Sequence, residues 1–442
     1  MGVQFPQDAL KMYTKEEKYL REKSRNYSIK EGFFSTIKDS IINNYINPFA
    51  IAINSSNSLI AMISSLQGLL SPLTEIFSSK LIEKNPRKKI ILNSVYFEIL
   101  SFVLLILIAI LYYFNILRDF LPFFLIFSFS FYLISFSVGI PAWFSWIGDL
   151  VDDRYRGRWF AKRNFVFNIL ALLVSVTSAV LLYFFKKINL LMFGFVLLFF
   201  IAMFSRRISM YYLNKQYEPE LKIEKKYYFR FSDFVKKMLF NNFGRFTLFR
   251  ALFSLSVMIA GPFFVVYMLR DLNFDYITFS IIVGSQTFFS IISLRLWGKF
   301  SDRYGNYEVL KITSVLISLV PVLWIFSKSP LYLVLIAQLV SGVAWSGFNL
   351  AYSNYILDCV SKQRRALVFS YHEMVNGIGI FVGSSIGAFL IKELKISFMN
   401  LILFIFLISA IARFLVAIVM LPKIREVKNK KKFCLRDFFR IK

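Results

Sequence analysis

Long apolar runs recur along almost the whole chain and constrain its fold more than any other feature. A helix that crosses a membrane needs about 20 mostly apolar residues. Of the 442 residues, 57% are hydrophobic and only 18% are charged, which is too apolar for a soluble globule of this size. The pattern predicts twelve membrane spans, at residues 33–53, 57–78, 90–114, 120–148, 163–185, 189–213, 246–269, 277–297, 310–327, 331–357, 367–391 and 397–421.

The composition of these runs favours helices over strands. Spanning strands would be about ten residues long, with alternating apolar and polar side chains, whereas these runs are continuous and rich in Leu, Ile and Phe. No P-loop, HExxH motif, CxxC array or nucleophile triad occurs, and a single histidine cannot form a multi-histidine metal site. We therefore predict an all-α membrane protein that is not an enzyme and that holds no cofactor or metal.

The placement of the basic residues predicts the orientation of the chain. The net charge is +27, and about 45 of the 53 Lys and Arg residues fall in the two tails, the central linker and the even-numbered connections. Because basic residues collect on the cytoplasmic side, both termini are expected in the cytoplasm and the chain in the plasma (inner) membrane. No nucleic-acid partner is then needed to explain the charge.

Three short segments of the first half recur in the same order in the second half. Their offsets are near half the chain length, which indicates duplicated six-helix units. The predicted units are an N-terminal bundle with its tail (1–213), a cytoplasmic linker (214–245) and a C-terminal bundle with a basic tail (246–442). The matched segments are SSKLIEKNPRKK (78–89) with GKFSDRYGNYEVLK (298–311), NPF (47–49) with GPF (261–263), and the longer segments that begin at Asp149 and Asp358.

One of these turns resembles a family signature. The major facilitator superfamily carries G-x-x-x-D-R-x-G-R-R/K after its second helix, and Gly298, Asp302 and Arg303 match its first part. The first copy is degenerate, with Ser79 for Gly and Glu83 for Asp. With twelve spans in two halves, the chain resembles this superfamily. The resemblance implies two pseudo-symmetric six-helix bundles that rock around a central site, as in a secondary transporter.

The ends of the two signature copies differ. The first keeps the expected basic residues as Arg87 and Lys88, whereas the second has Asn306 and Tyr307. A further element, D-x6-R, occurs at the ends of the fourth and tenth spans and resembles the E-x6-R element of sugar porters, which holds the cytoplasmic gate closed. A solvated charged face is the alternative. The predicted gating residues are Glu83, Lys84, Arg87, Asp149, Arg156, Gly298, Asp302, Arg303, Asp358 and Arg365.

The superfamily lines its central cavity with the first, fourth, seventh and tenth helices. In this chain those spans carry neutral amides and aromatic rings, which suit a sugar or another neutral polar solute and would also suit a drug. Hydrogen bonding between helices is the alternative role for any one of them. The predicted substrate-binding residues are Asn43, Asn47, Tyr132, Trp143, Gln338, Trp345, Asn349 and Tyr352.

Ionisable side chains inside the spans are costly unless they are paired or hydrated. His372 and Glu373 are therefore candidates for coupling to a proton or cation, because both can titrate near neutral pH in a membrane. Static ion pairs are the alternative. The predicted pairs are Glu98 with Arg206 or Arg207, and Glu373 with Arg413.

Two rows of small residues can let helices approach closely. One is Ala61, Ser65 and Gly68 in the second span, and the other is Gly379, Gly383 and Gly387 in the eleventh. We expect either a sliding interface between the bundles or ordinary packing within one half.

These observations predict an alternating-access transporter of a small organic solute, monomeric and embedded in the lipid bilayer. A sugar is favoured by the D-x6-R resemblance. An exporter of hydrophobic or drug-like compounds is the alternative, although the fifth span lacks the Gly and Pro that such exporters usually carry. A non-transporting membrane sensor on the same scaffold is the alternative from another class.

Overall fold

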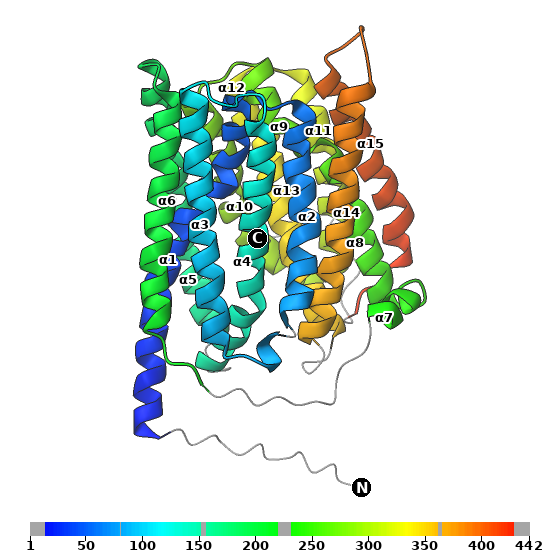
Figure 1. Cartoon of the computed structure of the whole chain (residues 1–442). Helices are drawn as coiled ribbons and strands as arrows, with labels where there is room; N and C mark the ends of the chain where they lie inside the picture. The colour runs from blue at the N-terminus through cyan, green and yellow to red at the C-terminus, as the bar shows by residue number, and fades with distance from the viewer. Residues whose placement is uncertain (1–13, 80, 152–155, 220–230, 361–364, 428–442) are drawn as a thin grey trace.

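The computed structural model describes residues 14–79, 81–151, 156–219, 231–360 and 365–427, and all regular structure in this part of the chain is helical. The long helices run side by side between two ends of a bundle (Figure 1). We call the end at which α1 (Lys15–Ala52) begins the tail end and the opposite end the far end. The prediction of an all-helical fold is confirmed.

The described part of the first half consists of six long helices and one short turn. Its first helix begins with a capping box, in which the Thr14 hydroxyl accepts from Glu17 N at 3.1 Å and the Glu17 carboxylate accepts from Thr14 N at 3.2 Å. It ends where Asn54 takes a positive φ of 59°. The remaining elements are α2 (Asn57–Ser79), η1 (Leu81–Glu83), α3 (Arg87–Tyr113), α4 (Leu121–Leu150), α5 (Arg156–Lys187) and α6 (Leu191–Asn214).

The described part of the second half also has six long helical segments, two of them interrupted. Pro262 separates α8 from α9, whereas Pro48 in the first half is accommodated inside α1. The elements are α7 (Phe231–Lys237), α8 (Asn242–Ala260), α9 (Phe263–Val266), η2 (Tyr267–Asp271), α10 (Tyr276–Tyr304), α11 (Asn306–Phe326), α12 (Pro330–Tyr332), η3 (Leu333–Ala337), α13 (Gln338–Cys359), α14 (Arg365–Glu393), α15 (Leu401–Met420) and η4 (Leu421–Lys423).

Eleven helices in the described residues are long and apolar enough to cross a membrane. They overlap the second to twelfth predicted spans, although the ends differ by a few residues. The first predicted span, residues 33–53, lies in α1, which is more polar than the others because it includes Lys38, Asp39 and several amide and hydroxyl side chains. Apolar length alone therefore gives eleven spans. The predicted count of twelve is reached only if the polar helix α1 is counted as a span.

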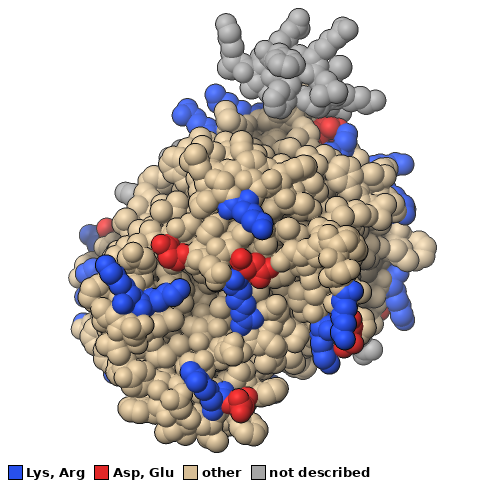
Figure 2. Space-filling model, turned by 90° about the horizontal axis from the view of Figure 1, so that it is seen from above, with Lys and Arg blue, Asp and Glu red and all other residues tan. Residues whose placement is uncertain are grey.

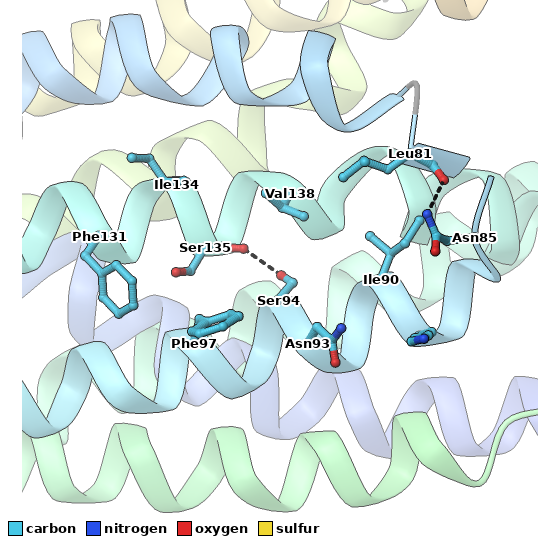
Figure 3. Close-up of a pocket in the computed structure, with 11 residues that line it drawn as sticks. Leu81, Asn85, Ile90, Asn93, Ser94, Phe97, Phe131, Ile134, Ser135 and Val138 are labelled. Atoms are coloured by element: carbon cyan, nitrogen blue, oxygen red, sulfur yellow. Dashed lines mark hydrogen bonds between the residues drawn. The ribbon is translucent and has the colours of Figure 1, made fainter. Parts of the chain in front are cut away.

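Helix packing within the first half brings polar side chains between the helices. Ser94 of α3 donates to the Ser135 carbonyl of α4 at 2.6 Å (Figure 3). Besides α3 with α4, the main contacts in this half join α1 with α6, α3 with α6 and α2 with α4. The halves meet along α2 with α14 and α5 with α10.

The two rows of small residues have different roles. A side chain at Gly68 of α2 would collide with Ile380 of α14, and Ser65 lies 3.3 Å from Ser385 across the same interface. The row of Gly379, Gly383 and Gly387 on α14 instead packs within its own half, since a Cβ at Gly379 would lie 2.2 Å from the Ala251 carbonyl of α8. Only the row on α2 therefore serves the contact between bundles.

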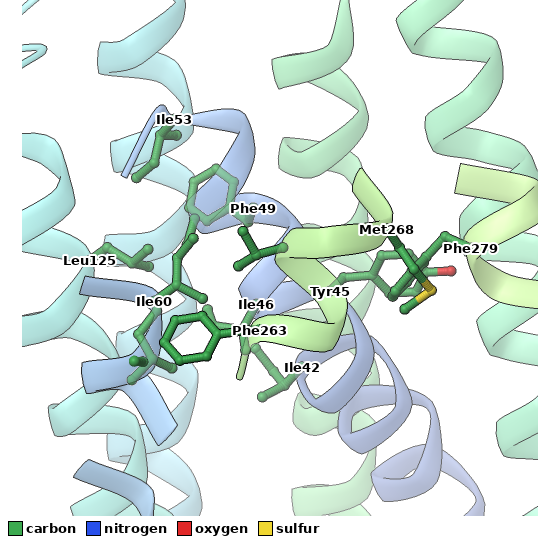
Figure 4. Close-up of a cluster of buried hydrophobic side chains, with 14 of the residues drawn as sticks. Ile42, Tyr45, Ile46, Phe49, Ile53, Ile60, Leu125, Phe263, Met268 and Phe279 are labelled. Carbon is green, nitrogen blue, oxygen red and sulfur yellow. The ribbon is translucent and has the colours of Figure 1, made fainter. Parts of the chain in front are cut away.

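A buried apolar cluster closes the halves against each other toward the far end. Side chains of α1 meet side chains of α9, η2 and α10, and the largest members have almost no exposed surface (Figure 4). Arg270 of η2 also donates to the Ser55 carbonyl and to Asn57. The principal members are Ile42, Tyr45, Ile46, Phe49, Phe263, Met268 and Phe279.

The surface seen from the far end is mostly uncharged. Basic and acidic side chains are scattered over it singly or in small groups of mixed sign (Figure 2). The large positive charge of the chain is not gathered on this face.

Candidate functional site

A cluster of charged side chains lies buried inside the first half, between α1, α3 and α6. Glu98 accepts two hydrogen bonds from Arg206, at 2.9 and 2.7 Å, so the structure forms one of the ion pairs expected from the sequence. Lys38 lies 3.3 Å from Glu98 and 2.5 Å from Asp39, and its ammonium group donates to the Tyr132 hydroxyl at 3.2 Å. Glu98 and Lys38 are fully buried, and their charges are compensated by one another and by these neighbours.

A cavity of about 290 Å³ lies beside this cluster. Two carboxylates, Glu31 and Asp39, and two guanidinium groups, Arg163 and Arg206, line it, so its charged groups balance. Its aromatic walls come from α4 and α5. They are Phe136, Trp143, Phe144 and Phe167.

Two polar groups at this cavity lack hydrogen-bond partners. Glu31 accepts from Ser209 at 3.2 Å through one oxygen, but its buried Oε2 accepts no hydrogen bond and lies 3.8 Å from Arg163. The Nε of Arg163 is likewise unpartnered. A small polar solute could satisfy both groups, because unpaired buried groups are costly.

The position of Arg163 depends on close packing between α1 and α5. Its guanidinium lies over the rings of Trp143 and Phe167, with 5.0 and 4.5 Å to the ring centroids. A Cβ at Gly32 would lie 2.4 Å from both Arg163 and Phe167. A glycine at this position therefore lets the cation reach the cavity.

A second cluster lies in the other half, where α8, α13 and α14 meet. Tyr352 donates to Glu373, and Asn376 donates to its second oxygen at 3.3 Å. The buried ring of His372 lies 2.8 Å from the Thr247 hydroxyl through Nδ1, while its Nε2 has no partner. Tyr352, predicted to bind substrate, therefore meets His372 and Glu373, predicted for coupling, but the imidazole is packed within the protein.

The predicted pair of Glu373 with Arg413 is wrong. Arg413 donates to the Ile317 carbonyl at 3.0 Å and to the Ser409 hydroxyl at 3.1 Å, and in the described part of the chain no carboxylate contacts it. Glu373 instead accepts hydrogen bonds from Tyr352 and Asn376. The spacing along the helices allowed the pair, but the two side chains point to different neighbours.

At the tail end, each half carries a similar polar latch. In the first half Arg87 pairs with Asp149 at 2.6 Å, and its backbone N–H donates to Glu218 at 2.7 Å. In the second half Asn306 donates to Asp358 at 3.0 Å. The N–H of the next residue, Tyr307, donates to Glu426 at 2.8 Å. The substitution of Asn for Arg thus preserves the contact with the aspartate.

The other predicted gating residues vary in their surroundings. Lys84 is exposed, and the guanidinium of Arg303 lies 5.2 Å from the centroid of the Tyr304 ring. A Cβ at Gly298 would meet nothing within 4 Å, whereas Gly305 adopts a φ of +97° beside Glu426. Asp302 lies in the last turn of α10. The side chains of Glu83, Arg156 and Arg365 lie outside the described part of the structure.

The remaining predicted substrate residues are more dispersed. Asn43 and Asn349 are exposed, and the buried Asn47 oxygen has no hydrogen-bond partner. Trp345 packs on Phe348 with ring centroids 5.7 Å apart. Gln338 is buried at the start of α13. Only Tyr132 and Trp143, described above, lie at the charged cluster and cavity of the first half.

Sequence reasoning missed several residues of the first-half site, of which Lys38 and Asp39 were the most accessible to it. Both fall inside the predicted span 33–53, where any ionisable side chain indicates function. Glu31 lies just before that span and Arg163 at the start of another, so their burial was not evident from hydropathy.

Comparison with known proteins gives a consistent result. Residues 246–437 match the sequence model of the Major Facilitator Superfamily. Two relatives come from Bacillus subtilis (strain 168). The uncharacterized MFS-type transporter YfiU is 31% identical over 101 residues, which is 23% of this chain and 19% of YfiU. The uncharacterized MFS-type transporter YhjO is 24% identical over 175 residues, which is 40% of this chain and 42% of YhjO. The matches thus span less than half of either relative.

Solved structures share the fold over nearly the whole chain. A bacterial homologue of the iron transporter ferroportin in an inward-facing state has a TM-score of 0.67 at 15% identity, covering 90% of this chain and 98% of that one. The nucleoside transporter NupG has a TM-score of 0.63 at 14% identity, covering 91% and 98%. At these identities the likeness concerns the fold alone.

Proposed function

We propose that this chain, whose residues 246–437 match the Major Facilitator Superfamily, is a member of that superfamily and a secondary active transporter of a small organic solute. Two six-helix bundles, residues 1–213 and 246–442 joined by the linker 214–245, would rock around a site between them and expose it to either side of the membrane in turn. Both termini would lie in the cytoplasm and the chain in the plasma membrane.

The cavity of the first half is the observation that carries this proposal. Charged side chains inside a membrane protein are expensive and tend to mark a substrate pathway. Here Glu98, Lys38 and Arg206 compensate one another, while Glu31 and Arg163 keep unpartnered atoms at a cavity of about 290 Å³. A solute with both a donor and an acceptor would pair with these atoms.

The balance of charge and the aromatic walls favour a sugar or another neutral polar solute. Equal numbers of carboxylates and guanidinium groups line the cavity, so a solute with net charge would leave one group uncompensated. Rings such as Trp143 cover the apolar faces of a sugar well. The polar residues predicted on α1 and α13 do not line this cavity, and they would contact the solute at the interface between the halves.

The tail-end latches would act as gates. Arg87 with Asp149 and Asn306 with Asp358 each join the start of one helix to the end of another. Each contact joins two helices of the same half, so it would hold the tail end of its own bundle in one shape while the two bundles move against each other. Glu83, Lys84, Arg156, Gly298, Asp302, Arg303 and Arg365 would assist at the same turns.

The cluster at α8, α13 and α14 would couple solute transport to the movement of a proton or cation. Glu75 of α2 and Glu373 of α14 lie on helices that pack against each other across the interface between the halves, and binding of a proton or cation at either carboxylate would reduce the repulsion between them. His372 precedes Glu373 in α14, and its buried ring contacts the Thr247 hydroxyl. Export of drug-like compounds is the second candidate function, because four aromatic side chains line the same cavity.

The test combines binding with transport. We expect a reproducible rise in melting temperature of the purified protein with sugars in a panel that also includes amino acids, organic acids and lipophilic cations. The stabilising compound should then enter proteoliposomes, and Asp302→Asn should slow that flux without loss of folding or binding. A response to lipophilic cations alone would make export the leading function, and flux that is unchanged by Asp302→Asn would remove its gating role.

A further inference from the structure

A groove of about 380 Å³ follows the flank of the first half between α3 and α4 (Figure 3). Its middle is apolar and partly exposed, with Phe97, Phe131 and Ile134 along its length; the side chains of Phe97 and Ile134 are 45% and 42% exposed. This groove shares only Ser94 with the lining of the charged cavity.

The groove faces away from the inside of the bundle. The α4 residues that line it, such as Ile134 and Val138, lie on the side opposite Tyr132 and Phe136. Tyr132 and Phe136 contact Lys38 of α1. In a membrane-spanning bundle, an exposed apolar groove on this side is in contact with lipid.

The end of the groove nearest the tail end is polar and basic. Asn85, Lys89 and Asn93 lie there, all three exposed. In the described part of the chain no ion pair joins Lys89 to a carboxylate. Lys89 and Phe97 are separated by about 12 Å of helix rise, which is close to the half-thickness of the hydrocarbon core, about 15 Å. The polar end of the groove therefore suits a lipid headgroup, and its apolar middle lies at the depth of an acyl chain.

We propose that this groove binds one phospholipid of the adjacent leaflet, with an anionic headgroup at Lys89 and an acyl chain along Phe97, Phe131 and Ile134. Lys89 is the third residue of α3. The third residue of α11 is Glu308, which has the opposite charge and is paired with Lys311 at 3.0 Å. The site therefore belongs to the first half only.

Native mass spectrometry of the delipidated, detergent-solubilised protein tests the proposal. Phosphatidylglycerol and phosphatidylcholine are added in equal amounts. The unmodified protein should retain about fivefold more phosphatidylglycerol than phosphatidylcholine, as one basic contact predicts. Lys89→Glu should abolish this preference. Ile134→Trp, at a partly exposed position, should fill the groove and reduce retention of both lipids at least threefold.

Lys299→Glu is the matched control, because it makes the same charge change at the corresponding turn of the second half. It should retain phosphatidylglycerol as the unmodified protein does. The proposal is overturned if Lys89→Glu keeps the preference, if Lys299→Glu loses it equally, or if Ile134→Trp retains both lipids fully. Size-exclusion profiles establish that each variant is folded.

Discussion

The two halves of this molecule share a helical plan but stabilise it with different chemistry. Glu98 is the eleventh residue after the start of α3, and Ile317 is the eleventh after the start of α11. In the first half the Glu98 carboxylate accepts hydrogen bonds from Arg206. In the second half the backbone carbonyl of Ile317 accepts a hydrogen bond from Arg413. A buried arginine is thus kept by a carboxylate in one half and by neutral oxygens in the other.

The same difference recurs at the tail end. The latch of the first half is an ion pair from Arg87 to Asp149, and that of the second is a hydrogen bond from Asn306 to Asp358. The comparison indicates that the repeated geometry can tolerate either chemistry. The first half has concentrated its charges around a cavity, which is why we place the solute there.

The largest effect should come from Glu98→Gln. This change leaves the buried cations Arg206 and Lys38 without their shared anion and should destabilise the protein by about 3–5 kcal/mol. Arg413→Met, the matched change in the second half, removes only bonds to neutral acceptors and should cost at most about 2 kcal/mol. Denaturant unfolding in detergent measures both. Equal losses would contradict the contrast between the halves.

The next effect concerns the cavity. Glu31→Gln should weaken solute binding about 10- to 100-fold, a loss of roughly 1.4–2.8 kcal/mol, because the unpartnered carboxylate oxygen is lost. Glu373→Gln should leave binding within about threefold, since Tyr352 and Asn376 already occupy that carboxylate. Titration calorimetry with the solute from the melting screen measures both. A larger loss for Glu373→Gln would move the site to the second half.

A smaller effect is expected from exchanging the latches. Arg87→Asn should give the first half the chemistry of the second and cost about 1.5–3 kcal/mol, the range for hydrogen bonds to charged groups. Asn306→Arg adds a cation near Asp358 but removes the hydrogen bond that the buried Asn306 accepts from Ser301, and it should cost about 1–3 kcal/mol. Thermal unfolding at low and high salt distinguishes the two. A salt-independent loss in Arg87→Asn would argue against an ionic latch.

The smallest effects should follow from removing single neutral contacts. Asn43→Ala and Asn349→Ala each remove one amide, and each should weaken binding by about 0.5–1.5 kcal/mol, or a few-fold. Trp345→Ala should act in the same direction through lost ring contact. Binding at unmodified strength in all three variants would assign these side chains to packing.

The fold was largely readable from the sequence, and the site only in part. Apolar length located eleven spans directly, whereas the division into two duplicated halves stays a prediction from the repeated turns. The Glu98–Arg206 pair was predictable because both groups lie at similar depth, but depth alone gave an equally plausible partner to Glu373, namely Arg413. The rotation of each helix about its axis is set by packing, and it decides which of two groups at one depth meet.

The sequence by itself determined the helical class and the polar turns at the tail end, because these follow from local composition and short motifs. Only the tertiary structure decided that Glu31, Asp39, Arg163 and Arg206 surround one cavity, and that Arg413 rests on backbone carbonyls. Those residues come from α1, α5, α6 and α15, and their meeting depends on contacts between helices far apart in the chain. Such contacts follow from the packing of whole helix faces, which no single stretch of sequence contains.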